Sequence, residues 1–463
     1  TVSRPRLRRR RVLTISVVSF PLLLDRDVGV VTAIGTSIRG VAANPVTMAV
    51  WGLIVAGGLS ALSMETLRRH AAVSGSQFAH YFADKRELIG AVLSRQIEVV
   101  LAFHRQPKLN ALQSLDDFER WLDLNLRYLR RIGYTGTPTY HALAAQLAKS
   151  DEQTRAALAD GYQQWISLFE GAITQLKRRR ILTAKADAHD LALVLVATHQ
   201  GSGSVAFAYR EDWPLADGLR FAVNRLRSFA TDPAERVPRP ARRTRRRAGD
   251  ETRRRAEAVF TRKGLATRAR IVDATATLMY DRGVAGTSMD DVRRAAGVSG
   301  SQLSHYFGDK RDLIREVVAS RREQVRAFHT KPAFGGFDSI EALQDWPDTC
   351  IADIDAVYRR GGCVYGSLAG ELTDADDQIH GDLAGGYQEW IALFIDGLEA
   401  MRRRGELVRA ASPRHLAAAL VIAHQGGAML THVTGDAEPL RVNVNAAVDY
   451  VRAFTPAAAT RRR

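Results

Sequence analysis

Two short segments of the chain begin with hydrogen-bonding side chains that could contact a nucleic acid. Thr287 and Ser288 precede MDDVRRAA, and Ser299 lies shortly before SQLSHYF. Ser288 and Asp291 have the spacing of a capping box, and Gly297 permits the positive φ that a tight turn between helices commonly needs. The pattern predicts a helix-turn-helix. In this motif the first segment starts near a phosphate, and the N-terminal side chains of the second reach base edges in the major groove.

The surrounding sequence predicts the helices that would position this motif. An apolar stripe at i, i+3, i+4 and i+7 begins at Ile271 and predicts a helix with its N-cap at Thr267 and its end at Gly283. A long helix is expected from about Asp309 to Phe328. Further apolar helical faces follow at 386–404, 415–430 and 443–454. With few alternating β-branched runs, the chain is expected to be all-α.

The whole domain is written twice at a constant offset of 225 residues. Residues 63–89 and 288–314 are identical at 18 of 27 positions. The offset continues without a gap through GYQQWISLF and GYQEWIALF, and through HQG at His199 and at His424. A period this long indicates a duplicated domain rather than a solenoid repeat.

Composition limits the partners and the compartment. The net charge of +16 is concentrated in residues 1–11, 232–263 and 461–463, which would attract a polyanion loosely or simply be solvated. Two cysteines without metal-ligand spacing argue against a disulfide framework and favour the cytoplasm. The basic and apolar N-terminus resembles a signal peptide, but Pro21 interrupts its apolar run and Asp25 follows closely. We therefore expect neither secretion nor a membrane span.

The stretch TSMDDVRRAAGVSGSQLSHYFGDKRDLI resembles the DNA-binding domain of the TetR family of transcriptional regulators. The matching features are the Thr-Ser start, the Ala-Gly-Val-Ser turn, the Tyr-Phe pair and the Lys that opens the next helix. The resemblance implies tandem all-α domains, each with a three-helix helix-turn-helix part and a helical ligand and dimerisation bundle. The expected divisions are a basic and apolar segment (1–42), a degenerate helix-turn-helix domain (43–105), a regulatory domain (106–231), an Arg/Pro-rich linker (232–263), a second helix-turn-helix domain (264–330), a second regulatory domain (331–455) and a basic tail (456–463).

The resemblance also implies which residues contact DNA. Phosphate contacts fall on Thr287, Tyr306 and Lys310, and on Tyr81 and Lys85 in the first copy, where Leu62 replaces the threonine. The same candidate interface includes Ser288. The groove-facing residues would be Ser299, Gly300, Ser301, Gln302 and Ser304 in the second copy, and Ser74, Gly75, Ser76, Gln77 and Ala79 in the first. His305 and His80 are further candidates for contacting DNA. Gln302 and Gln77 are the best candidates for reading a base, because a glutamine amide can pair bidentately with adenine.

The first copy departs from the family pattern at its N-terminal end. Its first helix would be VTMAVWGLIVAGG, which is apolar on every side, and Ala72 replaces the turn glycine. Positive φ at Ala72 would cost about 1 kcal/mol. We therefore expect the first DNA-binding domain to be damaged, and a disrupted or shifted reading frame over residues 1–62 is one explanation.

Aromatic and polar residues of the regulatory parts are candidates for a ligand pocket. They are Trp165, His199 and Gln200 in the first copy, and Trp390, His424 and Gln425 in the second. A hydrogen-bonded core or interface histidine is the commoner role, and it is the interpretation favoured here. No nucleophile elbow, phosphate loop, metal spacing or paired carboxylate stands out, so we expect no catalysis, metal or cofactor.

The sequence therefore predicts a TetR-type repressor released by an unknown small-molecule inducer. The two copies would form an internal pseudo-dimer on a double-stranded DNA operator with two half-sites, since symmetric half-sites need symmetric readers. Pairing between two chains is the alternative oligomeric state. Two other functions remain open: a ligand-binding or oligomerisation module that has lost operator recognition, and a nonspecific nucleic-acid binder acting through its Arg-rich linker.

Overall fold

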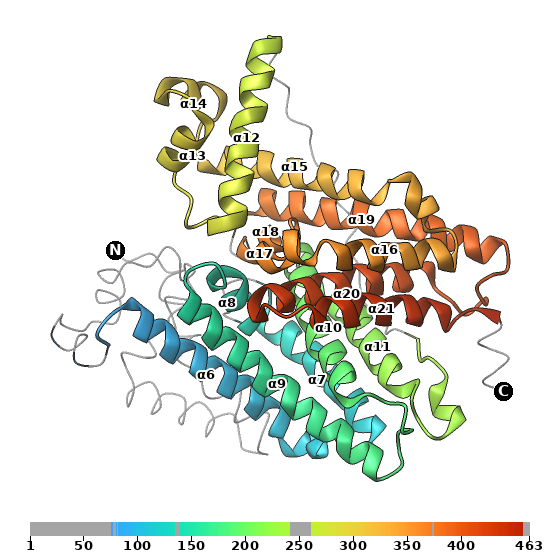
Figure 1. The fold of residues 1–463 in the computed structure, drawn as a ribbon. Helices are drawn as coiled ribbons and strands as arrows, with labels where there is room; N and C mark the ends of the chain where they lie inside the picture. The colour runs from blue at the N-terminus through green and yellow to red at the C-terminus, as the bar shows by residue number, and fades with distance from the viewer. Residues whose placement is uncertain are drawn as a thin grey trace.

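The computed structural model describes Ser76, His80 and residues 82–134, 139–240, 261–372 and 375–456, and the elements in these ranges are helical apart from one isolated β-bridge (Figure 1). We call α6–α11 the first half and α12–α21 the second half. The helices of the first half are α6 (Lys85–Arg105), α7 (Leu115–Ile132), α8 (Tyr140–Leu147), α9 (Glu152–Arg178), α10 (Ala188–Tyr209) and α11 (Trp213–Arg227), with short 3₁₀ segments η2 (Pro107–Leu112) and η3 (Pro233–Arg236).

The second half repeats this order after the three described helices that precede α15, which we call the reader lobe. The reader lobe consists of α12 (Arg262–Arg282), α13 (Met289–Ala296) and α14 (Gly300–Tyr306). The rest are α15 (Lys310–His329), η4 (Pro332–Phe337), α16 (Ile340–Ala352), the π-turn η5 (Ile354–Tyr358), α17 (Arg359–Gly361), α18 (Gly366–Glu371), α19 (Asp377–Arg403), α20 (Pro413–Thr434) and α21 (Glu438–Arg452). The bounds of α9, α10 and α11 recur in α19, α20 and α21 at an offset of 225, as the sequence repeat predicts.

Local side-chain caps explain where the helices of the reader lobe begin. The predicted capping box at Ser288 is confirmed, Ser299 forms a second capping box, and Asp309 accepts from the first turn of α15. The predicted cap at Thr267 is wrong, because Thr261 caps α12 instead. Thr267 lies inside the helix and donates its hydroxyl to the Lys263 carbonyl (3.0 Å), a bond that keeps a threonine within a helix.

Each half is built around one buried histidine between two tryptophans. The His104 ring accepts from the indole N–H of Trp121 (2.9 Å) and lies within 3.3 Å of that of Trp165. His329 repeats this arrangement with Trp390 (2.8 Å) and Trp346. Burial lowers the pKa of both histidines to about 4, so both rings are neutral acceptors at neutral pH.

The two halves pack together through their last two helices. Helices α10 and α11 lie against α20 and α21 in the middle of the molecule (Figure 1). Helices α10 and α20 are long and apolar enough to cross a membrane by length and composition alone, but 89% and 94% of their most apolar windows are buried within the molecule. Packing in this bundle accounts for their apolar composition.

Helices α10 and α20 cross in backbone contact at the glycine of the repeated His-Gln-Gly sequence. A Cβ atom on Gly426 would lie 1.7 Å from the Ala197 carbonyl oxygen, and one on Gly201 would lie 2.1 Å from the Ile422 carbonyl oxygen. Only a residue without a side chain fits at such a crossing. The two glycines are 225 residues apart, so the crossing lies at equivalent points of the two halves.

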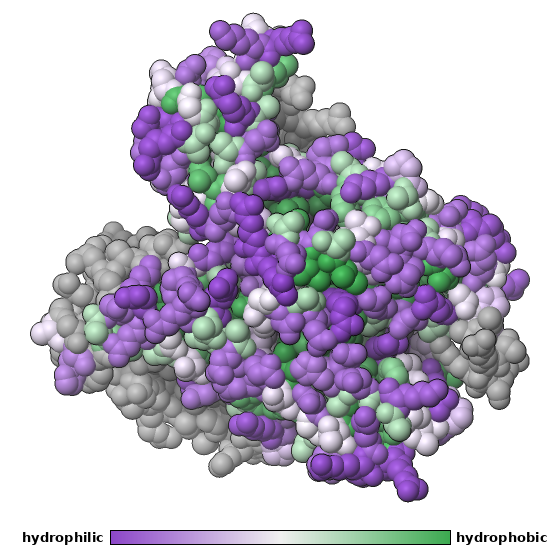
Figure 2. All heavy atoms as spheres, in the orientation of Figure 1, coloured by the Kyte–Doolittle hydropathy of each residue, from purple (hydrophilic) through white to green (hydrophobic). Residues whose placement is uncertain are grey.

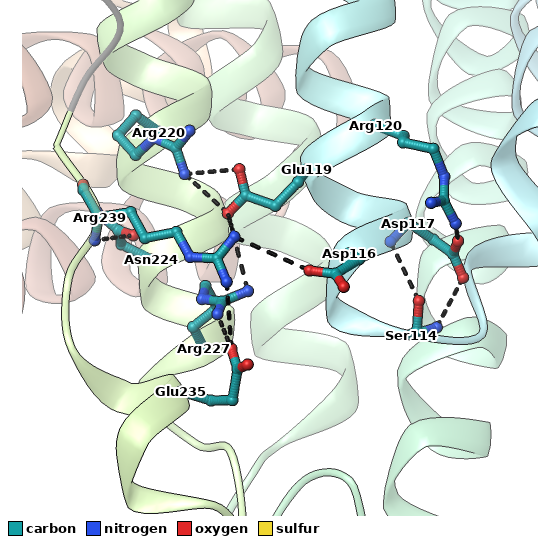
Figure 3. Close-up of polar contacts among 10 residues, drawn as sticks. All are labelled: Ser114, Asp116, Asp117, Glu119, Arg120, Arg220, Asn224, Arg227, Glu235 and Arg239. Atoms are coloured by element: carbon teal, nitrogen blue, oxygen red, sulfur yellow. Dashed lines mark hydrogen bonds and ion pairs between the residues drawn. The ribbon is translucent and has the colours of Figure 1, made fainter.

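The first residues of the predicted linker are fixed to the first half by an arginine cluster (Figure 3). Arg227 of α11 is 2% exposed and pairs with Glu235 of η3. Arg239 pairs with Glu119 of α7 (3.4 Å), and Glu119 also accepts from Arg220 (2.8 Å). The chain therefore leaves the first half beside α7 and α11, at the end of the bundle where the two halves meet.

Candidate DNA-binding site

The reader lobe is a compact three-helix unit that projects from the body of the molecule (Figure 1). Its core is small and apolar, with Val292 of α13, Leu303 of α14 and Phe307 each at most 4% exposed. Gly297 separates α13 from α14 in the left-handed conformation (φ 60°), which confirms the predicted turn. The arrangement is a helix-turn-helix, with α14 in the position of the recognition helix.

The start of α14 presents polar side chains to solvent. The predicted groove-facing residues Ser299, Gly300, Ser301, Gln302 and Ser304, and the further candidate His305, are all exposed. Figure 2 shows hydrophilic residues along the outer side of this lobe. Gln302 completes the capping box, since its Oε1 accepts from the Ser299 amide (2.9 Å) while its own amide donates to the Ser299 hydroxyl (3.1 Å). Their roles in reading bases remain predictions.

The predicted phosphate-contacting residues differ in exposure. Ser288 is exposed at the start of α13, and Tyr306 is half-buried at the end of α14. Thr287 is 1% exposed and donates its hydroxyl to the Gly283 carbonyl (2.9 Å). Lys310 is half-buried, and its ammonium donates to the Val284 carbonyl (2.6 Å). Burial lowers the pKa of Lys310, partly offset by the nearby Glu371 carboxylate.

Only part of the first predicted reader lies within the described residues. Ser76 and His80 are helical and exposed, and Lys85 is the first residue of α6, with Asp84 as its N-cap. Ser74, Gly75, Gln77, Ala79 and Tyr81, together with the apolar helix predicted before them, lie outside the described residues. The expectation that this reader is damaged therefore stays a prediction.

The reader lobe is attached to the body through the C-terminal end of α12 and the turn that follows it. The Tyr280 hydroxyl donates to the Val357 carbonyl (2.6 Å) and lies within 3.0 Å of the Gly362 carbonyl. The Glu371 carboxylate of α18 accepts from the backbone amide of Val284 (2.5 Å). Because of these bonds, the orientation of the reader lobe depends on the position of α17 and α18.

Glu371 also connects the reader lobe to the first half. Its carboxylate pairs with the ammonium of Lys149, which follows α8, at 2.8 Å, and the two side chains are 5% and 4% exposed. Burial raises the pKa of Glu371, while Lys149 acts in the opposite direction. No local sequence pattern marks Tyr280, Glu371 or Lys149, because each acts through a residue distant in sequence.

The predicted pocket residues lie in hydrogen-bonded core networks. In the first half, Gln200 donates to His199 Nδ1 (3.1 Å) and accepts from Tyr162 (3.0 Å), and Trp165 is 1% exposed. In the second half, Gln425 accepts from Tyr387 (3.1 Å), His424 contacts the Tyr358 hydroxyl (2.9 Å), and Trp390 is equally buried. Burial lowers the pKa of His199 and of His424 to about 3. Both rings are therefore neutral near pH 7.

An open groove lies elsewhere in the first half. It has a volume of about 740 Å³ and lies between α6, η2 and α9, with His104, Leu112, Gln163, Ser167 and Gly171 among its lining residues. At the corresponding place in the second half, the Phe337 ring lies 4.4 Å from that of Phe394. A Cβ on Gly397 would also meet the Gly336 carbonyl oxygen at 2.3 Å. The first half is thus open where the second is filled.

Comparisons with known proteins agree with this architecture. Residues 271–317 match the family model for bacterial regulatory proteins of the tetR family. Residues 340–447 match the tetracyclin repressor-like C-terminal domain, and residues 115–218 match the C-terminal domain of LmrA/YxaF-like transcriptional regulators. One DNA-binding match and two separate C-terminal matches indicate a tandem arrangement.

Individual relatives are similar over part of the chain. The HTH-type transcriptional repressor KstR2 of Rhodococcus jostii is 28% identical over 91 residues, which cover 20% of this chain and 45% of that protein. The repressor DhaR of a Mycobacterium species is 21% identical, covering 37% of this chain and 86% of that protein. Among solved structures, a regulatory protein TetR from Rhodobacter sphaeroides is 20% identical with a TM-score of 0.37, covering 40% of this chain and 98% of that one.

The fold and the exposed turn define a helix-turn-helix DNA-binding protein with helical C-terminal domains. With the matches to the TetR DNA-binding model and to two TetR C-terminal models, the chain belongs to the TetR family of transcriptional regulators. Regulators of this family bind DNA operators and typically dimerise.

Proposed function

We propose that the protein is a transcriptional repressor in which the two halves of one chain take the place of the two subunits of a dimer. The observation that carries this proposal is the bundle of α10 and α11 with α20 and α21. Its helices are equivalent in the two halves, and they cross at equivalent glycines, Gly201 and Gly426. An isologous dimer interface has this arrangement, in which the same surface of both partners meets at a two-fold axis.

The linker between the halves favours pairing within one chain. The covalent connection of about 20 residues between Pro240 and Thr261 keeps the second half close to the first. Tethering of this kind gives an effective concentration on the order of millimolar. Pairing between separate chains at micromolar concentration would therefore compete poorly.

The proposed target is an operator with two similar half-sites. The side chains at the start of α14 are exposed, and the sequence Ser-Gly-Ser-Gln recurs at the equivalent place in the first half. Repression, rather than activation, is proposed because KstR2 and DhaR are named as repressors.

We also propose that a small molecule bound in the groove of the first half releases the protein from DNA. The groove volume of about 740 Å³ is within the range of small-molecule sites, and apolar side chains such as Leu101 and Leu112 line it beside polar ones. Helix α9 forms one wall of this groove and contacts α20 of the second half. A ligand that moved α9 would thus bias the arrangement of the two halves.

Selection of bound sequences from random DNA with the full chain tests the DNA-binding proposal. The expected result is one enriched motif with two similar half-sites, bound by a single chain of 51.0 kDa. Enrichment of no sequence, together with a binding constant set only by salt, would favour nonspecific binding through the basic linker. Absence of DNA binding at any salt concentration would favour a module that has lost operator recognition.

A variant that fills the groove tests the ligand proposal separately. Gly171 lines the groove, and a Cβ added there would meet no atom within 4 Å, so Gly171→Trp should fold and occupy the groove. In a compound screen, molecules that release wild-type protein from the selected operator should leave this variant bound. Gly90→Trp on α6, also in open space but not lining the groove, is the matched control and should respond like the wild type. Equal release of all three proteins would exclude the groove.

A further inference from the structure

The surface between the two halves contains ion pairs that are not repeated between the equivalent residues, 225 positions away. Lys149 of the first half pairs with Glu371 of the second at 2.8 Å, buried on both sides. The Asp217 carboxylate of the first half lies 2.9 Å from the His415 ring of the second, a contact that is an ion pair only when the ring is protonated. Arg225 of the first half pairs with Asp449 of the second at 3.0 Å. A perfectly repeated chain would contain each of these contacts twice, related by the offset of 225.

The sequence shows why the reciprocal pairs are missing. The counterparts of Lys149 and Glu371 are Asp374 and Gln146, and those of Arg225 and Asp449 are Tyr450 and Asn224. The counterparts of Asp217 and His415 are Val442 and Asp190. Where the reciprocal contact of Arg225–Asp449 is described, it is a neutral hydrogen bond between Asn224 and Tyr450 (3.0 Å). Each of these charged contacts therefore forms only when a first half faces a second half.

Pairing of like halves would be penalised at the same positions. Two second halves would bring Glu371 opposite Asp374, so that two carboxylates share the place of a buried ion pair. Two first halves would bring Asp190 opposite Asp217, and would leave Lys149 opposite Gln146. Removing one partner of a buried pair, or replacing it by a like charge, costs far more than a surface pair contributes. Specificity of this kind comes from repulsion in the wrong complex as much as from attraction in the right one.

We propose that the two halves have diverged into complementary partners, so that the interaction surface of the first half accepts the second half and rejects another first half. The occupant of each surface is the other half of this chain. This inference rests on the proposed pairing of the halves and goes beyond it, because it assigns the choice of partner to charged contacts between the halves. Such a chain would not join other chains through like halves.

Two sets of full-length variants, each with light scattering and thermal unfolding, test the proposal. Lys149→Glu places a second carboxylate against Glu371 and should lower the unfolding midpoint by roughly 10 °C. It should also shift part of the population from 51.0 kDa toward twice that mass. The matched control is Arg315→Glu, which breaks the Arg315–Asp382 pair (2.7 Å) inside the second half. This control should lower the midpoint while the mass stays at 51.0 kDa.

The second set separates complementarity from simple stability. Arg225→Asp alone should lower the midpoint, and Arg225→Asp with Asp449→Arg should restore it, because the exchanged charges again attract. Restoration would support the proposal whether the contact forms within a chain or between chains. Additive losses in the double variant, together with an unchanged mass for Lys149→Glu, would overturn it. A wild-type mass of twice 51.0 kDa would instead overturn the pairing of the halves within one chain. The charge exchange would then still decide whether the first half selects a second half as its partner.

Discussion

The crossing of α10 and α20 gives a prediction whose size can be worked out from the structure. The change is Gly426→Ala, the smallest substitution that adds a side-chain atom. The new Cβ would lie 1.7 Å from the Ala197 carbonyl oxygen and 2.4 Å from the carbonyl carbon. Carbon and oxygen atoms in contact are normally about 3.3 Å or more apart, so the helices must separate locally by roughly 1.5 Å. The obstacle is backbone, which cannot rotate away as a flexible side chain would.

The expected cost is that of overpacking, about 1–3 kcal/mol. The matched control is Gly381→Ala in α19, where a Cβ would meet no atom within 4 Å. Replacing a helical glycine by alanine in open space should stabilise the protein by about 0.5–1 kcal/mol. The two substitutions are chemically identical, and they should change the free energy of unfolding in opposite directions, differing by about 1.5–4 kcal/mol.

Thermal unfolding followed by circular dichroism measures this difference. At about 2–4 °C per kcal/mol, the midpoints of the two variants should differ by roughly 3–15 °C, with the wild type between them. Gly201→Ala should behave like Gly426→Ala, and the double variant should cost less than the sum, because both act at one crossing. If Gly426→Ala unfolds at or above the wild-type temperature, the helices do not cross at this residue and the close contact of the two halves is wrong.

Three further predictions concern the reader lobe and pH. Lys310→Ala should weaken binding to all DNA sequences alike and lower the slope of log affinity against log salt by about one unit. Lys310→Arg, which keeps the positive charge, should keep the slope. A loss of affinity for the operator alone would contradict a phosphate contact. Gln302→Glu keeps the oxygen that accepts from the Ser299 amide but loses the side-chain amide donor. The variant should therefore lose about 1–3 kcal/mol of discrimination at one base pair without lowering the unfolding midpoint. Unchanged specificity would refute base reading by Gln302. Burial lowers the pKa of His424 to about 3, so the neutral ring contributes stability above pH ~6.5 that is lost, at about 1.4 kcal/mol per pH unit, as the pH falls toward 3. In urea unfolding, His424→Gln should therefore reduce the dependence of the unfolding free energy on pH over this window. An unchanged pH dependence would contradict the burial of the His424 ring.

The features predicted correctly from the sequence are those set by neighbouring residues. The capping box at Ser288 and the left-handed Gly297 each depend on a few consecutive residues, so a short pattern specifies them. The wrong cap at Thr267 also has a local cause, since a threonine bonded to the preceding turn is as compatible with a helix interior as with its start. The early start of α19 at Asp377, ahead of the predicted 386, follows from the cap at Asp376.

The features that were missed depend on contacts between distant parts of the chain. Lys149 and Glu371 are separated by 222 residues, and nothing near either residue marks it as a partner of the other. In the repeated His-Gln-Gly sequence, the histidine and the glutamine are the residues whose chemistry suggests a pocket. In the structure those two lie in the core network, and the glycine is the residue that the helix crossing requires. Comparing the two copies position by position would have revealed the charge differences, without showing that they meet.

The one-sided contact at Glu371 has a consequence for how the two readers would respond to a change in the body. Glu371 holds the amide of Val284 and pairs with Lys149, so the second reader lobe is tied both to its own α18 and to the first half. The counterpart of Glu371 in the first half is Gln146, which carries no charge. A displacement between the halves would break a buried ion pair beside the second reader lobe, whereas a neutral Gln146 cannot form the equivalent ion pair. Separating the halves therefore includes the loss of a buried ion pair next to the second reader lobe.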